Sequence, residues 1–574
     1  MRSVALPKAE RIMFPRAVCL FFAAGALTAF ASGDPLVPHS DLRPKRGSEF
    51  HPGLVKLLDA DVREILVLTG QQSAIGTNEE VGARNERIRA LKFETADLRK
   101  LLKASSGTVR EWALRTMGER TMPGLPRPEL LAVATNRDER LFTRALAVRV
   151  LGREAMDGVT ADTLLGLLDE SDDIDYQRII MEALASGGRG LPAVGERLAR
   201  HLHSPHAAIQ HEAFSTLRQT GTRGRGLPND YARASGLSEL IEENAVEGAK
   251  AGLRLLREPG LPAYLRCAAL RSLGYQTNQA GAVQALLEAI EEGDDFISEL
   301  AGNVLNSLPP VDARGVAALA EGMRSTNEVV RLHALLRLNK AGQSVNGTAG
   351  AIVLALNRIA KEGAPGRESG LCLEIARKLG GQIAPGTGSL VEMLAETSPV
   401  YRDLTKHEVD RIRGMTFVAL AAAETPPGAL ESIVGALATS DESSVHEFAG
   451  AARAAAGLGP RGRVVIPQLK RALDTSDTSW SDWIALETFD AHANASAAYT
   501  TPQVEALRAL AVLGAKDAEV IRAIGIFAKA APADFDGIDS GVAIPNAREE
   551  ALKALSAMNP GRQRAGGVRR AAGK

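Results

Sequence analysis

The stretch VREWALRTMG, residues 109–118, decides the fold because its pattern returns along the chain. The pattern is an aliphatic residue followed by Arg, a small residue four positions after the first, a Leu-like residue eight positions after it, and often Gly. Strong copies begin at Thr143, Leu265, Val330, Ile412 and Ala547, and weaker copies begin at Tyr176, Ile209, Ile297, Leu371, Val445 and Glu505. Six of the eleven spacings between successive copies are 32 to 34 residues. Such a period is the signature of a repeat protein.

A second helical pattern precedes the copies. TLLGLLDESDD (residues 163–173) leads to the copy at Tyr176, and AVQALLEAIEEGDD (residues 282–295) leads to the copy at Ile297. Apolar residues in these stretches recur at the spacing of one helix face, and the acidic residues that follow offer an N-cap to the next helix. One helix pair cannot bury its apolar face alone, whereas stacked pairs form a continuous core. The sequence therefore predicts an all-α fold, a right-handed α-solenoid of about twelve helix pairs.

Composition agrees with closely packed helices and excludes several classes of protein. Of the 574 residues, 45% are hydrophobic but only 4% are aromatic, so small aliphatic side chains form most of the apolar mass. The formal net charge is −1, which gives no general attraction to nucleic acid or to an anionic membrane. We expect no nucleic-acid partner.

The N-terminus has the pattern of an export signal. Arg2, Lys8, Arg11 and Arg16 form a basic lead, an apolar run spans residues 17–31, and small residues precede the expected cleavage between Ala31 and Ser32. The run is shorter than the ~20 residues that span a bilayer. We expect a protein exported to a bacterial periplasm or the extracellular space, with no stable membrane insertion after cleavage. A retained signal that acts as an anchor is the alternative.

The remaining chain is expected to contain three further regions. Residues 32–104 form an N-terminal helical cap region, residues 105–558 form the solenoid, and residues 559–574 form a basic tail without acidic residues. After signal cleavage the two cysteines are Cys267 and Cys372, each within an apolar helical stretch. We expect both to be buried small hydrophobic residues without a disulfide.

The repeat motif resembles the bacterial HEAT repeat, including the phycobilisome-lyase-type HEAT-like repeats. The resemblance rests on V-R-x-x-A-x-x-x-L-G after an acidic turn and covers roughly residues 105–558. It implies the fold and says little of function, since HEAT arrays serve as scaffolds, adaptors, inhibitors and occasionally enzymes. It also implies that the motif arginines form an internal ladder with carboxylates of the turns. Binding of a phosphate or carboxylate ligand by these arginines is the alternative.

Two departures from the period mark inserts, near residues 220–240 and 475–500. The first contains a loop rich in Gly and Arg, TGTRGRGLPNDYARASG, residues 220–236. The second contains Trp480 and Trp483, two of only three tryptophans in the chain. Clustered tryptophans are frequent anchors of protein interfaces, so both are candidate partner-binding residues. An extra helix whose tryptophans pack onto the solenoid is the alternative.

Metal and catalytic motifs are weak. His201, His203 and His206 crowd together with His211 and are weak metal candidates, but their stretch also fits an ordinary turn between helices. The chain has no Walker loop, no G-x-S-x-G and no H-E-x-x-H. We therefore expect no catalytic residues and no cofactor.

These observations favour a monomeric, non-enzymatic scaffold or adaptor that binds a protein partner through the solenoid surface. Two alternatives stay open at this point. One is a lyase-like enzyme or a modification accessory of the HEAT type. The other is a structural or ligand-carrying component of the cell envelope.

Overall fold

The computed structural model describes residues 95–104, 107–119, 124–221, 227–275, 280–340, 347–438, 444–474, 484–489, 499–514, 517–531 and 546–558. The predicted signal peptide with Ala31 and Ser32, both candidate tryptophans and the basic tail lie outside these residues. The chain divides into two compact units, and their border in the sequence falls between Leu227 and Pro228.

The first unit packs its helices in two layers. One layer holds the motif helices α6 (Gly107–Glu119), α8 (Leu141–Leu151), α10 (Ile174–Gly187) and α12 (Ala207–Thr220). The other holds α5 (Thr95–Leu102), α7 (Arg127–Thr135), α9 (Gly158–Glu170) and α11 (Pro192–His201). Each motif helix contacts the helix before it in the chain and the next motif helix in its own layer. Because α5 pairs with α6, the predicted border at residue 105 falls inside the first helix pair.

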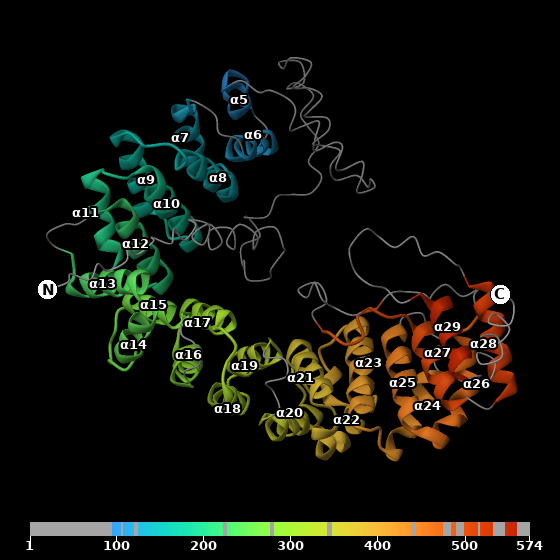
Figure 1. Cartoon of the computed structure of the whole chain (residues 1–574). Coiled ribbons are helices and arrows are strands. Elements are labelled where there is room, and N and C mark those ends of the chain that lie inside the picture. Colours follow the sequence, from blue (N-terminus) through green and yellow to red (C-terminus); the bar gives the residue numbers. More distant parts are fainter. Residues whose placement is uncertain are drawn as a thin grey trace, which may run out of the picture. The chain divides into compact units, whose positions relative to one another are not determined.

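The second unit repeats this arrangement (Figure 1). Its motif helices are α15 (Ala263–Leu273), α17 (Asp295–Ser307), α19 (Glu328–Lys340), α21 (Gly366–Leu379), α23 (Lys406–Ala422), α25 (Val445–Gly457), α27 (Pro502–Leu513) and α29 (Ala547–Met558). The helices that precede them are α14 (Ala245–Leu255), α16 (Ala280–Glu292), α18 (Ala313–Gly322), α20 (Ala349–Glu362), α22 (Thr387–Met393), α24 (Leu430–Ala438), α26 (Ile466–Arg471) and α28 (Ala518–Ala530). Short 3₁₀ helices are η4 (Gly380–Gly386), η5 (Pro399–Tyr401), η6 (Pro427–Ala429) and η8 (Gly459–Val465).

Every one of the twelve motif copies begins within a described helix, and successive copies lie on neighbouring helices of one layer within each unit. The predicted all-α solenoid is thereby confirmed. Its right-handed sense stays a prediction. The first insert differs from expectation, because residues 229–236 of the predicted loop form the first half of an additional helix, α13 (Asn229–Glu243), which packs on α14 and α15.

Acidic residues in the turns start helices of both layers: α9 of one layer, and the motif helices α10 and α17, as the sequence predicted. Asp157, Asp173 and Asp294 are N-caps whose side chains each accept a hydrogen bond from the backbone N–H three residues later. Thr405 and Glu408 form a complete capping box at the start of α23. These bonds satisfy backbone donors that have no partner inside the helix, so the acidic turns fix where the helices begin.

The small motif residues are buried between helices. Ala147, Ala269 and Ala334, each four positions into a strong copy, have no exposed surface and lie in the core. Cys267 and Cys372 are likewise buried and unpaired, and burial raises the pKa of each thiol to about 12. Among the described residues, no helix is both long enough and apolar enough to cross a membrane.

Replacement of Ala269 by Arg should strongly destabilise the second unit. The new side chain would overpack a filled site and bury an unpaired charge, at a combined cost of several kcal/mol, ~3 or more. The matched control is Ala232→Arg, because Ala232 is exposed on α13. Thermal unfolding followed by circular dichroism should show an early transition for Ala269→Arg alone. Equal melting of both variants would contradict the repeat register.

Candidate partner-binding face

Motif arginines join neighbouring repeats. Four of them pair with a carboxylate of the following repeat: Arg110 with Glu139 (2.6 Å), Arg266 with Glu292 (3.9 Å), Arg331 with Glu368 (2.9 Å) and Arg413 with Glu447 (2.7 Å). Arg144 donates instead to the Ala134 carbonyl (3.0 Å) and lies 4.8 Å from the ring centre of Tyr176. These arginines therefore bridge between repeats, as the HEAT resemblance implied, but only Glu139 lies in a turn, and the other three carboxylates lie within helices.

A short segment of the second insert lies across three motif helices. Residues 484–489, IALETF, form no helix, with a bridge at Ile484 and bends at Glu487 and Phe489, and we call them the strap. Ile484 and Leu486 pack with Val418 of α23 and Ala449 of α25, and Leu486 is fully buried. Phe489 lies at the far end against α21 and α23. The strap thus crosses the helices in the order α25, α23, α21, opposite to their order in the chain.

Fixed side chains hold the backbone of the strap. Arg411 of α23 donates to the carbonyl oxygens of Thr488 (3.3 Å) and Phe489. The backbone N–H of Phe489 donates to Glu374 Oε2 of α21 (3.4 Å). At the other end, Ile484 and Thr500 exchange two backbone hydrogen bonds of 2.9 and 3.0 Å. Contacts of this kind recognise an extended chain whatever its side chains are.

Two side chains of the strap add specific contacts. The carboxylate of Glu487 pairs with Arg377 of α21 (3.0 Å) and with Arg453 of α25 (2.5 Å). The Phe489 ring lies 5.0 Å from the guanidinium carbon of Arg411, a cation–π geometry. It also fills the space beside Gly370, where a Cβ would overlap the ring. A glutamate and an aromatic residue two positions later are therefore the strap side chains that these helices hold.

Arg453 ties the strap to the next repeat. It donates two hydrogen bonds to Glu505 of α27 (2.9 and 2.8 Å) as well as one to Glu487. Burial disfavours the charged guanidinium, but its bonds to Glu505 and Glu487 outweigh this and raise the pKa of Arg453. Burial likewise opposes ionisation of Glu505, whose pKa is nevertheless lowered by Arg453. Arg453 and Glu505 therefore both stay charged. The remaining guanidinium nitrogen of Arg453, Nη1, donates to the carboxylate of Glu487 in the strap.

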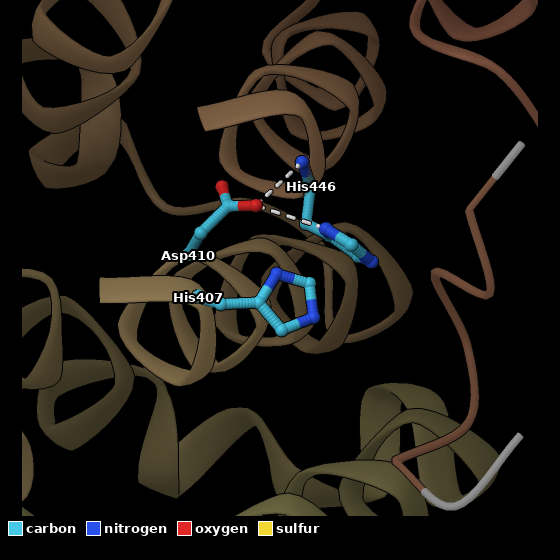
Figure 2. A group of neighbouring side chains, drawn as sticks. All are labelled: His407, Asp410 and His446. Carbon is cyan, nitrogen blue, oxygen red and sulfur yellow. Dashed lines mark hydrogen bonds and ion pairs between the residues drawn. The ribbon is translucent and has the colours of Figure 1, made fainter. Parts of the chain in front are cut away.

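A second polar group lies where α23 meets α25 (Figure 2). Asp410 Oδ2 accepts hydrogen bonds from His446 Nδ1 (2.9 Å) and from the His446 backbone N–H (3.1 Å), and Asp410 Oδ1 accepts one from the Glu447 N–H (2.8 Å). The ring centres of His407 and His446 lie 5.5 Å apart at 78°. Asp410 and His446 are buried, and His407 is exposed. Asp410 therefore caps α25 from the neighbouring repeat.

Two glycines permit this close approach. A Cβ on Gly450 of α25 would overlap the carbonyl group of Gly414 of α23, and a Cβ on Gly414 would overlap the His446 carbonyl group. Larger residues at either position would push the two helices apart. The distance between Asp410 and the start of α25 thus depends on both glycines.

The candidates from the sequence lie elsewhere or outside the described residues. His201 Nε2 is 3.3 Å from Asp169 Oδ1, and His203 and His206 are exposed in the turn before α12. Within the described ranges, His407, Asp410 and His446 are the group of three whose potential ligand atoms converge, all within 4.8 Å. Trp480 and Trp483 precede the strap but are not described. Sequence reasoning missed the strap and the histidine–aspartate group.

Comparisons with known proteins concern the architecture only. No protein-family profile and no curated protein sequence matches the chain. Among solved structures, an engineered protein is 16% identical with a TM-score of 0.36, over 82% of this chain and 99% of that one. Yeast importin-β, Kap95p, is 12% identical with a TM-score of 0.39, over 96% and 71%. A structure of Kap95p with RanGDP is 10% identical with a TM-score of 0.43, over 96% and 72%.

Gly370→Val should displace the strap without unfolding α21. The valine would occupy the space of the Phe489 ring, and overpacking typically costs about 1–3 kcal/mol. Amide hydrogen exchange of Ile484 and Thr500, which bond to each other, should become roughly 5- to 100-fold faster. Gly435→Val on α24 is the control, since nothing lies within 4 Å of its Cβ position. Equal protection in both variants would show that Phe489 does not rest on Gly370.

Proposed function

We propose that this protein is a binding scaffold that takes an extended segment of a partner protein across α21, α23 and α25. The observation that carries the proposal is the strap, a six-residue non-helical segment that these helices already hold. The partner segment would have a carboxylate followed two positions later by an aromatic residue.

The division of contacts supports a face that can exchange its occupant. Arg411 and Glu374 contact the strap backbone, so they would serve any extended chain. Arg377 and Arg453 select a carboxylate, and the space beside Gly370 accepts a flat ring. A preformed row of donors and a preformed ring site lower the ordering cost of binding. The chain's own strap is in this view an internal competitor for the partner.

The setting of this activity is also a proposal. Residues 2–31 have the basic lead, apolar run and small-residue end of an export signal, which supports action outside the cytoplasm of a bacterium. The resemblance of the repeat motif to bacterial HEAT repeats supports a bacterial origin of the protein. Trp480 and Trp483 stand directly before the strap in the sequence and would extend the partner contact as aromatic anchors.

A peptide added in trans tests the proposal. The double substitution Glu487→Ala with Phe489→Ala should weaken binding of the chain's own strap to α21, α23 and α25, because it removes the two side chains that make specific contacts. A fluorescein-labelled peptide of residues 484–489 should then bind this variant at least ~10-fold more tightly than the native protein, whose strap competes at high effective concentration. Fluorescence anisotropy measures both affinities.

Further single changes in the double variant locate the binding site. Arg377→Ala should lower the affinity of the double variant for the peptide by about tenfold or more, because a charged hydrogen bond contributes about 1.5–3 kcal/mol. Arg402→Ala is the control, since Arg402 is exposed before α23 and makes no side-chain contact with the strap in the described residues. The proposal is wrong if the double variant does not bind the peptide, or if Arg377→Ala and Arg402→Ala bind it equally.

A further inference from the structure

We propose that His407, Asp410 and His446 form a binding site for a divalent transition-metal ion of the zinc type. The three residues come from two neighbouring repeats, and the fold places one potential ligand atom of each within 4.8 Å of the others. His407 and Asp410 are three residues apart on α23, and thus on one helix face. His446 is the second residue of α25.

The chemistry of the donors selects the ion. Imidazole nitrogens suit Zn²⁺, Co²⁺ and Ni²⁺, whereas Ca²⁺ and Mg²⁺ prefer sites made of oxygen ligands. Two histidines and one carboxylate are an established ligand set for catalytic zinc. Three protein ligands leave at least one coordination position for water or for a carboxylate from another molecule.

Asp410 prepares the site before any ion arrives. Its carboxylate is fixed by the backbone N–H groups of His446 and Glu447 (3.1 and 2.8 Å) and it orients the His446 ring through Nδ1 (2.9 Å). His407 on the exposed side gives an ion access from solvent. The ligands therefore need little reorganisation, apart from rotation of the exposed ring.

The site would clamp α23 to α25 one turn from Arg411, the residue that holds the strap backbone. A bound ion would thus add a bond between the two repeats on which the strap lies. This inference does not depend on the proposed function, because it concerns binding of an ion and is measured without any partner.

The test is titration of the metal-stripped full chain with Co²⁺, followed by visible absorption, and with Zn²⁺, followed by calorimetry. We expect one Co²⁺ per chain with absorption bands of low-coordinate cobalt, and displacement by Zn²⁺. His407→Ala should lower the affinity for Co²⁺ at least ~10-fold, because even loss of a residue that only supports a metal ligand typically has this effect. Because His407 is exposed, this variant should keep the native melting temperature without metal.

The control is the triple variant His201→Ala, His203→Ala, His206→Ala, which removes the crowded histidines of the first unit. It should bind Co²⁺ like the native protein. Absence of stoichiometric binding by the native protein would overturn the proposal. So would a His407→Ala variant that binds like the native protein, or loss of binding in the triple variant, which would assign the ion to the first unit.

Discussion

Each helix pair has an apolar flank that only its neighbour can cover, and the rest of the structure follows from this constraint. The motif helices must lie close together, so the position four residues into each strong copy is small. Ala147, Ala269 and Ala334 are therefore fully buried. Close stacking also brings the start of each motif helix beside the previous one. Arginine–carboxylate pairs such as Arg331–Glu368 form at these crossings, with Glu368 almost fully buried. Paired and hydrogen-bonded charges are tolerated there, whereas a lone charge would not be.

The same constraint explains why the strap lies where it does. Stacked motif helices present stripes of residues at the spacing of a helical face, such as Gly370, Glu374 and Arg377 on α21. Such a surface has no backbone donors to offer, because helix backbones are internally bonded. Recognition of an extended segment must therefore come from long side chains, and Arg411, Glu374 and Arg453 provide it. The strap comes from the insert that breaks the period between α25 and α27, where extra residues can turn back over the stack.

Much of the fold was predictable because repeats leave a periodic record. The motif copies located the helices of one layer, the acidic turns located the first residues of α10 and α17, and the apolar surroundings of Cys267 and Cys372 placed both in the core. The strap was not predictable in this way. IALETF has no helical period, and its partners Glu374 and Arg411 lie more than 70 residues earlier in the sequence. The additional helix α13 was missed because Gly and Arg residues dominate the start of its insert.

The histidine–aspartate group was missed for a different reason. Crowding along the sequence drew attention to His201, His203 and His206, whereas in a stacked repeat protein neighbours in space are about one period apart. Asp410 and His446 are 36 residues apart and both lie near the start of a motif helix. They hold different positions in their copies, since Asp410 lies two residues before Ile412 and His446 lies one residue after Val445. In such a fold, polar residues should be compared across the period before they are grouped along the chain.

The strap lies across α21, α23 and α25, and an introduced pair of cysteines tests this position most directly. A Cβ at residue 370 would lie 2.8 Å from the Cβ of Phe489, so small movements would bring Gly370→Cys and Phe489→Cys into disulfide geometry. Cys267 and Cys372 are buried and unpaired, and should not compete. Mild oxidation followed by peptide mass spectrometry should find residues 370 and 489 joined within single chains. If both introduced thiols stay reduced and react fully with a thiol label, the strap does not lie across these helices.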